Sequence, residues 1–144
     1  ARLQKEKQTI IRKLHKTDEV LKNKLVLVVD DDIRNIYSLT NVLKEEGMNC
    51  LVAENGRLAL KMLKENPSVD IVLMDVMMPE MDGYDATREI RKLTKLEKLP
   101  VIALTAKAMK GDREKCLAAG MSDYISKPVN IDQLLSLMRV WLYR

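Results

Sequence analysis

Cysteine is scarce in this chain of 144 residues. Cys50 and Cys116 lie far apart and match no CxxC, zinc or haem spacing, so the sequence indicates neither a disulfide framework nor a cysteine metal site. With 47% hydrophobic residues, the chain can bury a core without such cross-links. We expect two reduced thiols, although the spacing alone leaves a bridge between them open.

Long apolar runs are also absent. None approaches the roughly 20 residues that a membrane-spanning helix needs. Residues 1–24 are too polar for a secretory signal. The sequence therefore predicts a cytoplasmic location and no membrane contact by this segment.

Aromatic residues make up only 3% of the chain, and phenylalanine is missing. The net charge of +4 is concentrated in residues 1–24, where eight Lys or Arg face three acids, so that the remaining 17 bases and 18 acids nearly cancel. A neutral body with few aromatics offers neither the basic face nor the stacking platform that nucleic acids require. We expect no nucleic-acid partner.

Residues 1–23 contain no strand pattern and have apolar residues at Leu3, Ile10, Leu14 and Leu21. This spacing predicts a linker helix. A coiled coil, and with it a dimer, stays open, since Lys7 and Thr17 would occupy its seam.

Residues 24–144 alternate short apolar runs with amphipathic stretches of helical length, which predicts one α/β domain. Parallel strands joined through helices give a doubly wound sheet with five strands and five helices. Asn55 and Asp82 are expected to cap helices, and Gly47 and Gly120 to end them. The expected strands are 25–29, 50–53, 70–74, 101–104 and 123–126, and the expected helices are 33–46, 55–66, 84–93, 110–119 and 131–142.

Polar residues stand at the ends of these strands, and the carboxyl ends of parallel strands meet at one edge of a sheet, where ligands bind. Clustered carboxylates call for a hard cation such as Mg²⁺. A carboxylate is also a nucleophile towards phosphorus, and a hydroxyl and an ammonium stabilise the transferred group. The residues that could together capture a phosphoryl group are Asp30, Asp31, Asp32, Asp75, Thr105 and Lys127. Each member has a plainer interpretation, and for Asp32 a helix cap is at least as good as a metal role.

Four segments resemble the receiver domain of response regulators, the CheY-like family with a flavodoxin-like fold. They are LVLVVDDD (25–32), LMDVMMPEMDGYD (73–85), ALTA (103–106) and DYISKP (123–128). The resemblance covers the chain from residue 24 onward and implies the strand order 2-1-3-4-5. It also implies a phosphorelay partner, either a histidine kinase or a histidine phosphotransfer domain.

By this resemblance, Asp75 takes the phosphoryl group, and Thr105 and Lys127 bind its oxygens. Mg²⁺ would be held by Asp30, Asp31 and Asp75 and by the backbone carbonyl of Met77. Thr105 and Tyr124 would form the switch that changes the partner-binding surface. The family pattern further implies a cis peptide before Pro128 and places Met77 and Lys107 where dephosphorylation is tuned. Such a domain accelerates its own phosphorylation and dephosphorylation and releases no outside product.

Further segments, RNIYSLTNVL (34–43), ALTAKAMKGDREKCLAAG (103–120) and LLSLMRVWLYR (134–144), resemble the carboxyl-terminal receivers of hybrid histidine kinases. A stand-alone receiver would end similarly. His15 is followed by Lys16, whereas kinase phosphorylation sites place an acid after the histidine, so we interpret His15 as a solvated side chain.

Two other functions fit parts of the sequence. A haloacid-dehalogenase-type phosphatase would use Asp30 as nucleophile and Asp32 as acid, but the downstream acidic pair and a substrate cap are missing. A flavodoxin-like FMN binder needs a hydroxyl-rich loop after its first strand to hold a phosphate. Here three carboxylates follow that strand and would repel a phosphate, so we discount this function.

Overall fold

The computed structural model describes residues 19–106 and 110–143. Five parallel strands lie in the order β2-β1-β3-β4-β5, which confirms the predicted fold class and strand order. The strands are β1 (Leu25–Val29), β2 (Asn49–Ala53), β3 (Ile71–Asp75), β4 (Val101–Thr105) and β5 (Asp123–Ser126).

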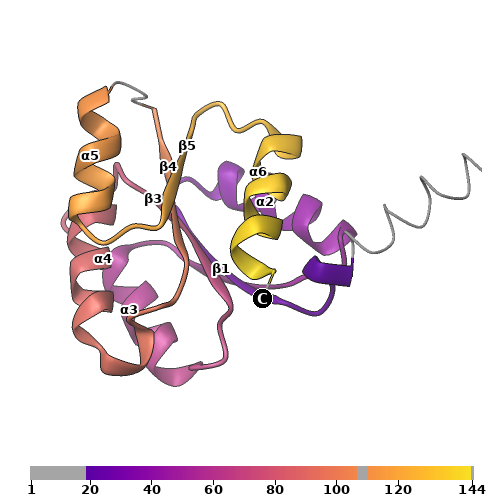
Figure 1. The fold of residues 1–144 in the computed structure, drawn as a ribbon, viewed down its shortest axis with the longest axis horizontal. Coiled ribbons are helices and arrows are strands. Elements are labelled where there is room, and N and C mark those ends of the chain that lie inside the picture. The colour runs from indigo at the N-terminus through magenta and orange to yellow at the C-terminus, as the bar shows by residue number, and fades with distance from the viewer. Residues whose placement is uncertain (1–18, 107–109, 144) are drawn as a thin grey trace, which may run out of the picture.

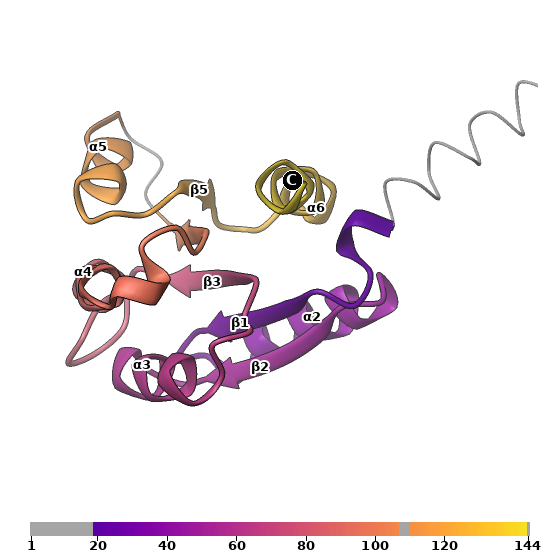
Figure 2. The ribbon, with the colours of Figure 1, turned by 60° about the horizontal axis from the view of Figure 1, so that its bottom comes forward.

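Helices cover both faces of the sheet (Figures 1 and 2). The α-helices labelled in Figure 1 are α2 (Ile33–Glu45), α3 (Gly56–Glu65), α4 (Gly83–Lys92), α5 (Lys110–Ala118) and α6 (Ile131–Leu142). A 3₁₀ turn, η1 (Thr94–Leu96), was not predicted, because so short an element has no periodicity of its own.

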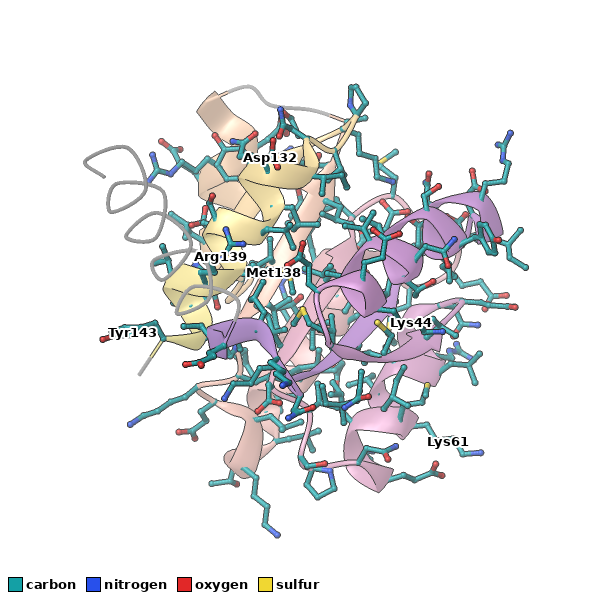
Figure 3. The ribbon with its side chains drawn as sticks, turned by 90° about the vertical axis from the view of Figure 1, so that its right-hand side faces the viewer. Lys44, Lys61, Asp132, Met138, Arg139 and Tyr143 are labelled. Atoms are coloured by element: carbon teal, nitrogen blue, oxygen red, sulfur yellow. The ribbon has the colours of Figure 1, made fainter. Side chains whose placement is uncertain are left out.

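The alternation of side chains along each strand divides the core into two layers. In β1, Leu27 and Val29 face the layer that contains α3, α4 and α5, whereas Val26 and Val28 face α2 and α6. All four of these side chains are buried, as expected for a strand covered on both faces. In Figure 3, Lys61 and Tyr143 extend outward, while Met138 on α6 belongs to the buried layer.

Capping side chains define the helix boundaries to within a residue of the prediction. Asn55 accepts a hydrogen bond from the Leu58 amide at 2.9 Å, and Asp82 accepts one from the Asp85 amide at 2.9 Å. Both residues stand just before their helices. Gly47 and Gly120 have φ angles of +83° and +98°, which explains glycine at these helix ends.

Candidate phosphoryl-transfer site

The predicted site residues come together at the carboxyl edge of the sheet. Asp30 follows β1, Asp75 and Thr105 are the last residues of β3 and β4, and Lys127 follows β5. These strands are neighbours in the sheet, so the parallel order alone brings the four side chains to one edge. Tight main-chain contacts reinforce the arrangement: the Lys127 amide donates to the Thr105 carbonyl at 2.7 Å.

Three carboxylates form the centre of the site. Asp30, Asp31 and Asp75 each offer an oxygen, and these oxygens lie within 4.8 Å of one another. Asp30 and Asp75 are buried, whereas Asp31 is exposed. Oxygen ligands at this spacing suit a hard divalent cation, which would relieve the repulsion between the two buried charges. The cluster could therefore hold a metal ion.

Asp30 is held in place by three donors. Its carboxylate accepts from the Asp32 amide at 2.8 Å, from Nδ2 of Asn35 at 3.3 Å and from Nζ of Lys127 at 3.5 Å. Asn35 was not among the residues predicted from the sequence. Its position on the first turn of α2, three residues after the cap, was the available signal, because that turn begins beside the acidic pair.

Lys127 contacts the predicted nucleophile directly. Its Nζ atom donates to Oδ1 of Asp75 at 3.1 Å, and the Lys127 side chain is only one-quarter exposed. Thr105 is 2% exposed and lies beside them at the end of β4. The Lys127–Pro128 peptide bond is cis, as the resemblance implied.

Burial, and after it the charge of Asp30, raises the pKa of Asp75 from 3.8 to about 6. The hydrogen bonds from Lys127 and the Met77 amide lower that pKa but do not compensate. Burial also lowers the pKa of Lys127, but the hydrogen bond and charge of Asp75, together with Asp30, outweigh it and leave that pKa raised. At neutral pH Asp75 is therefore mostly an ionised carboxylate beside a charged ammonium.

Met77 and Tyr124 are the predicted backbone metal ligand and the predicted switch residue. The Met77 amide donates to Oδ1 of Asp75 at 3.2 Å, and its side chain is 61% exposed, so it contributes little to the core. Tyr124 is half-buried against the layer of α3, α4 and α5. Their roles as metal ligand and switch stay predictions. Lys107 and His15 lie outside the described residues.

Asp32 caps α2 rather than facing the cluster. Its carboxylate accepts from the Arg34 amide at 2.9 Å and pairs with the Arg34 guanidinium at 3.1 Å. The hydrogen bond from the Arg34 side chain is the main reason why the pKa of Asp32 is lowered. A carboxylate held ionised in this way is a poor proton donor, which disfavours its use as the acid of a phosphatase.

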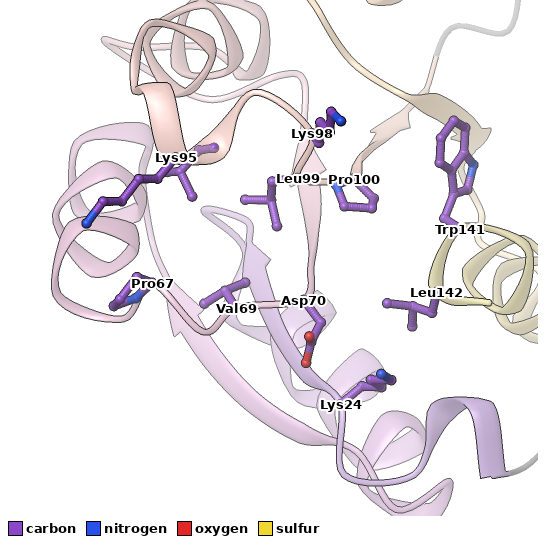
Figure 4. A pocket seen from close by; sticks show the side chains of 11 residues that line it. Lys24, Pro67, Val69, Asp70, Lys95, Lys98, Leu99, Pro100, Trp141 and Leu142 are labelled. Atoms are coloured by element: carbon purple, nitrogen blue, oxygen red, sulfur yellow. The ribbon is translucent and has the colours of Figure 1, made fainter. Parts of the chain in front are cut away.

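Two hollows differ in their relation to the site. The smaller, of about 210 Å³, borders Asp30 and Lys127, and its other lining residues come from α2, from β4 and from the segment after Lys127. The larger, of about 310 Å³, lies at the opposite end of the sheet between Pro67, Lys98 and Trp141 (Figure 4). The one carboxylate that lines it, Asp70, already accepts the Leu25 amide at 2.8 Å. Of these two hollows, only the smaller borders the candidate site.

Among the described residues, no helix has the length and apolar character required to cross a bilayer.

Comparison with known sequences identifies the family. A family model described as the response regulator receiver domain matches residues 26–139. Signal transduction histidine-protein kinase BarA of Escherichia coli is 38% identical over 122 residues, which are 85% of this chain and 13% of BarA. Two-component system protein A of Emericella nidulans is 44% identical over 120 residues, 82% of this chain and 17% of that protein. The chain thus spans less than one-fifth of the length of these relatives.

Comparison with solved structures also finds receiver domains. The receiver domain of sensor histidine kinase PA1611 from Pseudomonas aeruginosa, crystallised with a magnesium ion in its active-site cleft, is 36% identical with a TM-score of 0.78, and the match covers 85% of this chain and 99% of that one. The Saccharomyces cerevisiae complex of the phosphotransfer protein Ypd1 with the receiver domain of Ssk1 matches at 28% identity and a TM-score of 0.77, covering 83% of this chain and 89% of that one. Neither comparison supports a haloacid dehalogenase. With its acidic cluster, its lysine and its parallel sheet in order 2-1-3-4-5, the chain belongs to the response regulator receiver domain family.

Proposed function

We propose that this receiver domain takes a phosphoryl group from a phosphohistidine onto Asp75, with Mg²⁺ bound beside it. One observation carries the proposal: three carboxylate oxygens lie within 4.8 Å of one another while the ammonium of Lys127 lies 3.1 Å from Asp75. The donor would be a histidine kinase or a histidine phosphotransfer domain, and Ypd1, which was crystallised with a related receiver, is a protein of the second kind.

Mg²⁺ fits the donor set at the site. Asp30, Asp31 and Asp75 would hold it through carboxylate oxygens, and the Met77 carbonyl would complete the protein ligands. A bound ion supplies charge that stabilises the outer oxygens of the phosphoryl group. The related PA1611 receiver, with its magnesium ion, supports this choice of metal.

In the transfer step, a carboxylate oxygen of Asp75 forms a bond to phosphorus as the bond between phosphorus and the donor imidazole nitrogen breaks. The electron pair of the broken bond stays on that nitrogen, which then takes up a proton. Lys127 and Thr105 would hold the outer phosphoryl oxygens, where charge develops. Lys127 is already positioned by its hydrogen bond to Asp75.

A phosphoryl group on Asp75 would break the present hydrogen bond between Lys127 and Asp75, and the switch would follow from this change. Thr105 is buried next to the acceptor, and Tyr124 stands on the adjacent strand, paired in register with Ala103. A shift of Thr105 towards the phosphoryl oxygens would open space for Tyr124 and change the surface of α5, β5 and α6.

The donor would approach over the amino-terminal half of α2. Ile33 and Tyr37 are 74% and 69% exposed and stand one helical turn apart at the start of α2, the helix that follows the acidic pair. Large exposed apolar side chains next to a reactive group are typical of a protein-binding surface. We therefore assign this face to the phosphohistidine-bearing partner.

We also propose that the domain is part of a hybrid histidine kinase, with residues 1–23 as its linker helix and a cytoplasmic location. The support is the match to the histidine kinase BarA, in which the matched segment makes up 13% of the length.

The test compares two phosphoryl donors on the full chain. With acetyl phosphate and Mg²⁺, the wild-type chain should become labelled at Asp75, located by peptide mapping, and Asp75→Asn should abolish the label. Asp30→Asn should weaken labelling but leave it on Asp75. A label on Asp30 would instead support the phosphatase mechanism, and full labelling of the Asp75 variant would overturn the proposal.

With a phosphorylated histidine phosphotransfer protein as donor, Tyr37→Ala should slow transfer while leaving acetyl phosphate labelling unchanged. Tyr143→Ala provides the matched control, because Tyr143 is as exposed as Tyr37 but lies at the end of α6. Equal effects of the two variants would rule out the α2 face.

A further inference from the structure

The chain enters the domain through a helical turn whose last residue is buried. Residues 19–21 are helical, and Leu21 has no exposed surface. The sequence placed Leu21 in a linker helix outside the receiver. In the structure Leu21 belongs to the same core layer as Leu43, Met48 and Leu142, from α2, the segment before β2 and α6.

Hydrogen bonds fix the chain immediately after this turn. The Lys24 amide donates to the Leu21 carbonyl at 3.1 Å, and the Asn23 amide donates to the Gly47 carbonyl at 2.8 Å. Asn23 has a φ of +66°, a left-handed conformation that asparagine tolerates better than most residues. The turn therefore ends in a defined cap, and β1 begins only four residues after Leu21.

The turn also packs against the corner between α2 and β2. A Cβ atom at Gly47 would lie 3.4 Å from the side-chain Cγ and 3.8 Å from the backbone Cα of Lys22, which is van der Waals contact. Val20 is half-buried against the same core layer as Leu21. Figures 1 and 3 both show the turn close to the carboxyl end of α6.

We infer that residues 19–24 form a rigid joint, an interaction surface that docks the entering chain onto the receiver. Its partner is the chain's own core, with Leu21 as the anchor and Asn23 as the cap. A segment attached through this joint leaves the domain in one fixed direction, whereas a flexible tether would leave its orientation free. The inference does not depend on phosphoryl transfer, because none of its contacts involves the carboxylate cluster.

Backbone ¹⁵N relaxation of the full chain tests the joint directly. The amides of residues 21–23 should have order parameters of about 0.85, like those of β1, whereas a flexible tether would give values below about 0.6. Values in the flexible range in the wild-type chain would overturn the inference, whatever any variant does.

Hydrogen exchange at the Asn23 amide supplies a second readout. Leu21→Ala should speed this exchange on the order of tenfold or more relative to the amides of β3, since the turn loses its anchor while the sheet remains. Glu19→Ala is the matched control, because Glu19 belongs to the same turn but is exposed, and it should leave the exchange rate unchanged. Equal rates in the two variants would show that Leu21 does not hold the joint. If Leu21→Ala fails to fold, the wild-type order parameters decide the question.

Discussion

The Nζ atom of Lys127 lies 3.1 Å from Oδ1 of Asp75, and this contact joins the ends of two strands that are separated by β4 in the sheet. The same ammonium also reaches Asp30 at 3.5 Å. One positive charge thus faces two buried carboxylates. The pKa of Asp75 rises to about 6 despite the contact, because burial and then the charge of Asp30 outweigh it. The site is therefore short of positive charge.

This shortage predicts that Asp75→Asn stabilises the metal-free protein. An acid whose pKa rises on folding favours the folded state below its ordinary value of 3.8, and that contribution is lost as the pH rises through about 6. At pH 7.5 without divalent cations, the variant should gain about 1–3 kcal/mol in free energy of unfolding, measured by urea denaturation. The gain should vanish at pH values below 3.8, the ordinary pKa of an aspartate.

The control for that comparison is Glu54→Gln. Glu54 is exposed, and its replacement should change the free energy of unfolding by less than about 0.5 kcal/mol at either pH. An Asp75 variant less stable than the wild type at pH 7.5 would show that Lys127 compensates the two carboxylates after all.

Mg²⁺ is expected to supply the missing charge. At a concentration about 100-fold above its Kd, the ion should stabilise the wild-type chain by about 2.7 kcal/mol, and a chelator should remove the effect. The effect should weaken as the pH falls through about 6, because protons then compete for Asp75. Thermal denaturation with and without the ion measures both.

Asp31→Asn separates metal binding from folding. Asp31 is exposed and belongs to the carboxylate cluster, so its replacement should leave the metal-free melting temperature nearly unchanged and reduce the shift produced by Mg²⁺. If the variant keeps the full shift, the ion binds elsewhere.

Gly83 marks a place where the backbone of the site leaves no room for a side chain. A Cβ atom there would lie 2.5 Å from the carbonyl oxygen of Asp75 and 2.9 Å from Cα of Val76. Gly83→Ala should therefore cost about 1–3 kcal/mol and slow labelling of Asp75, because the acceptor strand must shift. Gly111→Ala is the matched control, since nothing lies within 4 Å of its added methyl group. Within α5 it should be neutral or stabilise by up to about 1 kcal/mol, and equal losses in both variants would contradict the steric argument.

The fold was predictable because local patterns and topology agree. The apolar run at 25–29 becomes a buried interior strand, and Asn55 and Asp82 cap the helices that follow them. Once the strands are parallel, Asp75 and Lys127 must arrive at one edge, so the proximity of these two side chains followed from the strand ends alone.

Other features depend on contacts between distant segments, which spacing in the sequence does not encode. Leu21 lies seven residues after Leu14, a spacing that favours a helix, yet a core layer shared with α6 buries it. Asn35 has a polar side chain typical of a helix surface, and only the geometry shows it donating to Asp30. The raised pKa of Asp75 likewise depends on its burial, which the sequence does not give.

The contacts of Arg91 likewise join segments that are distant in the sequence. From the end of α4, its Nε donates to the Gly120 carbonyl and one terminal nitrogen donates to the Leu96 carbonyl, both at 2.8 Å. One half-buried guanidinium thus joins α4 to the segment before β5 and to the 3₁₀ turn before β4. Arg91→Met keeps most of the apolar stem but removes a donor from both carbonyls, of which the Leu96 carbonyl retains the Leu99 amide at 3.3 Å. The variant should therefore cost about 1–3 kcal/mol in free energy of unfolding. Arg88→Met, one turn earlier, removes only an exposed pair with Asp85 and should cost less than about 1 kcal/mol. Urea denaturation of the two variants compares a buried clamp with a surface ion pair in the same helix, and similar losses would mean that water replaces the guanidinium at both carbonyls.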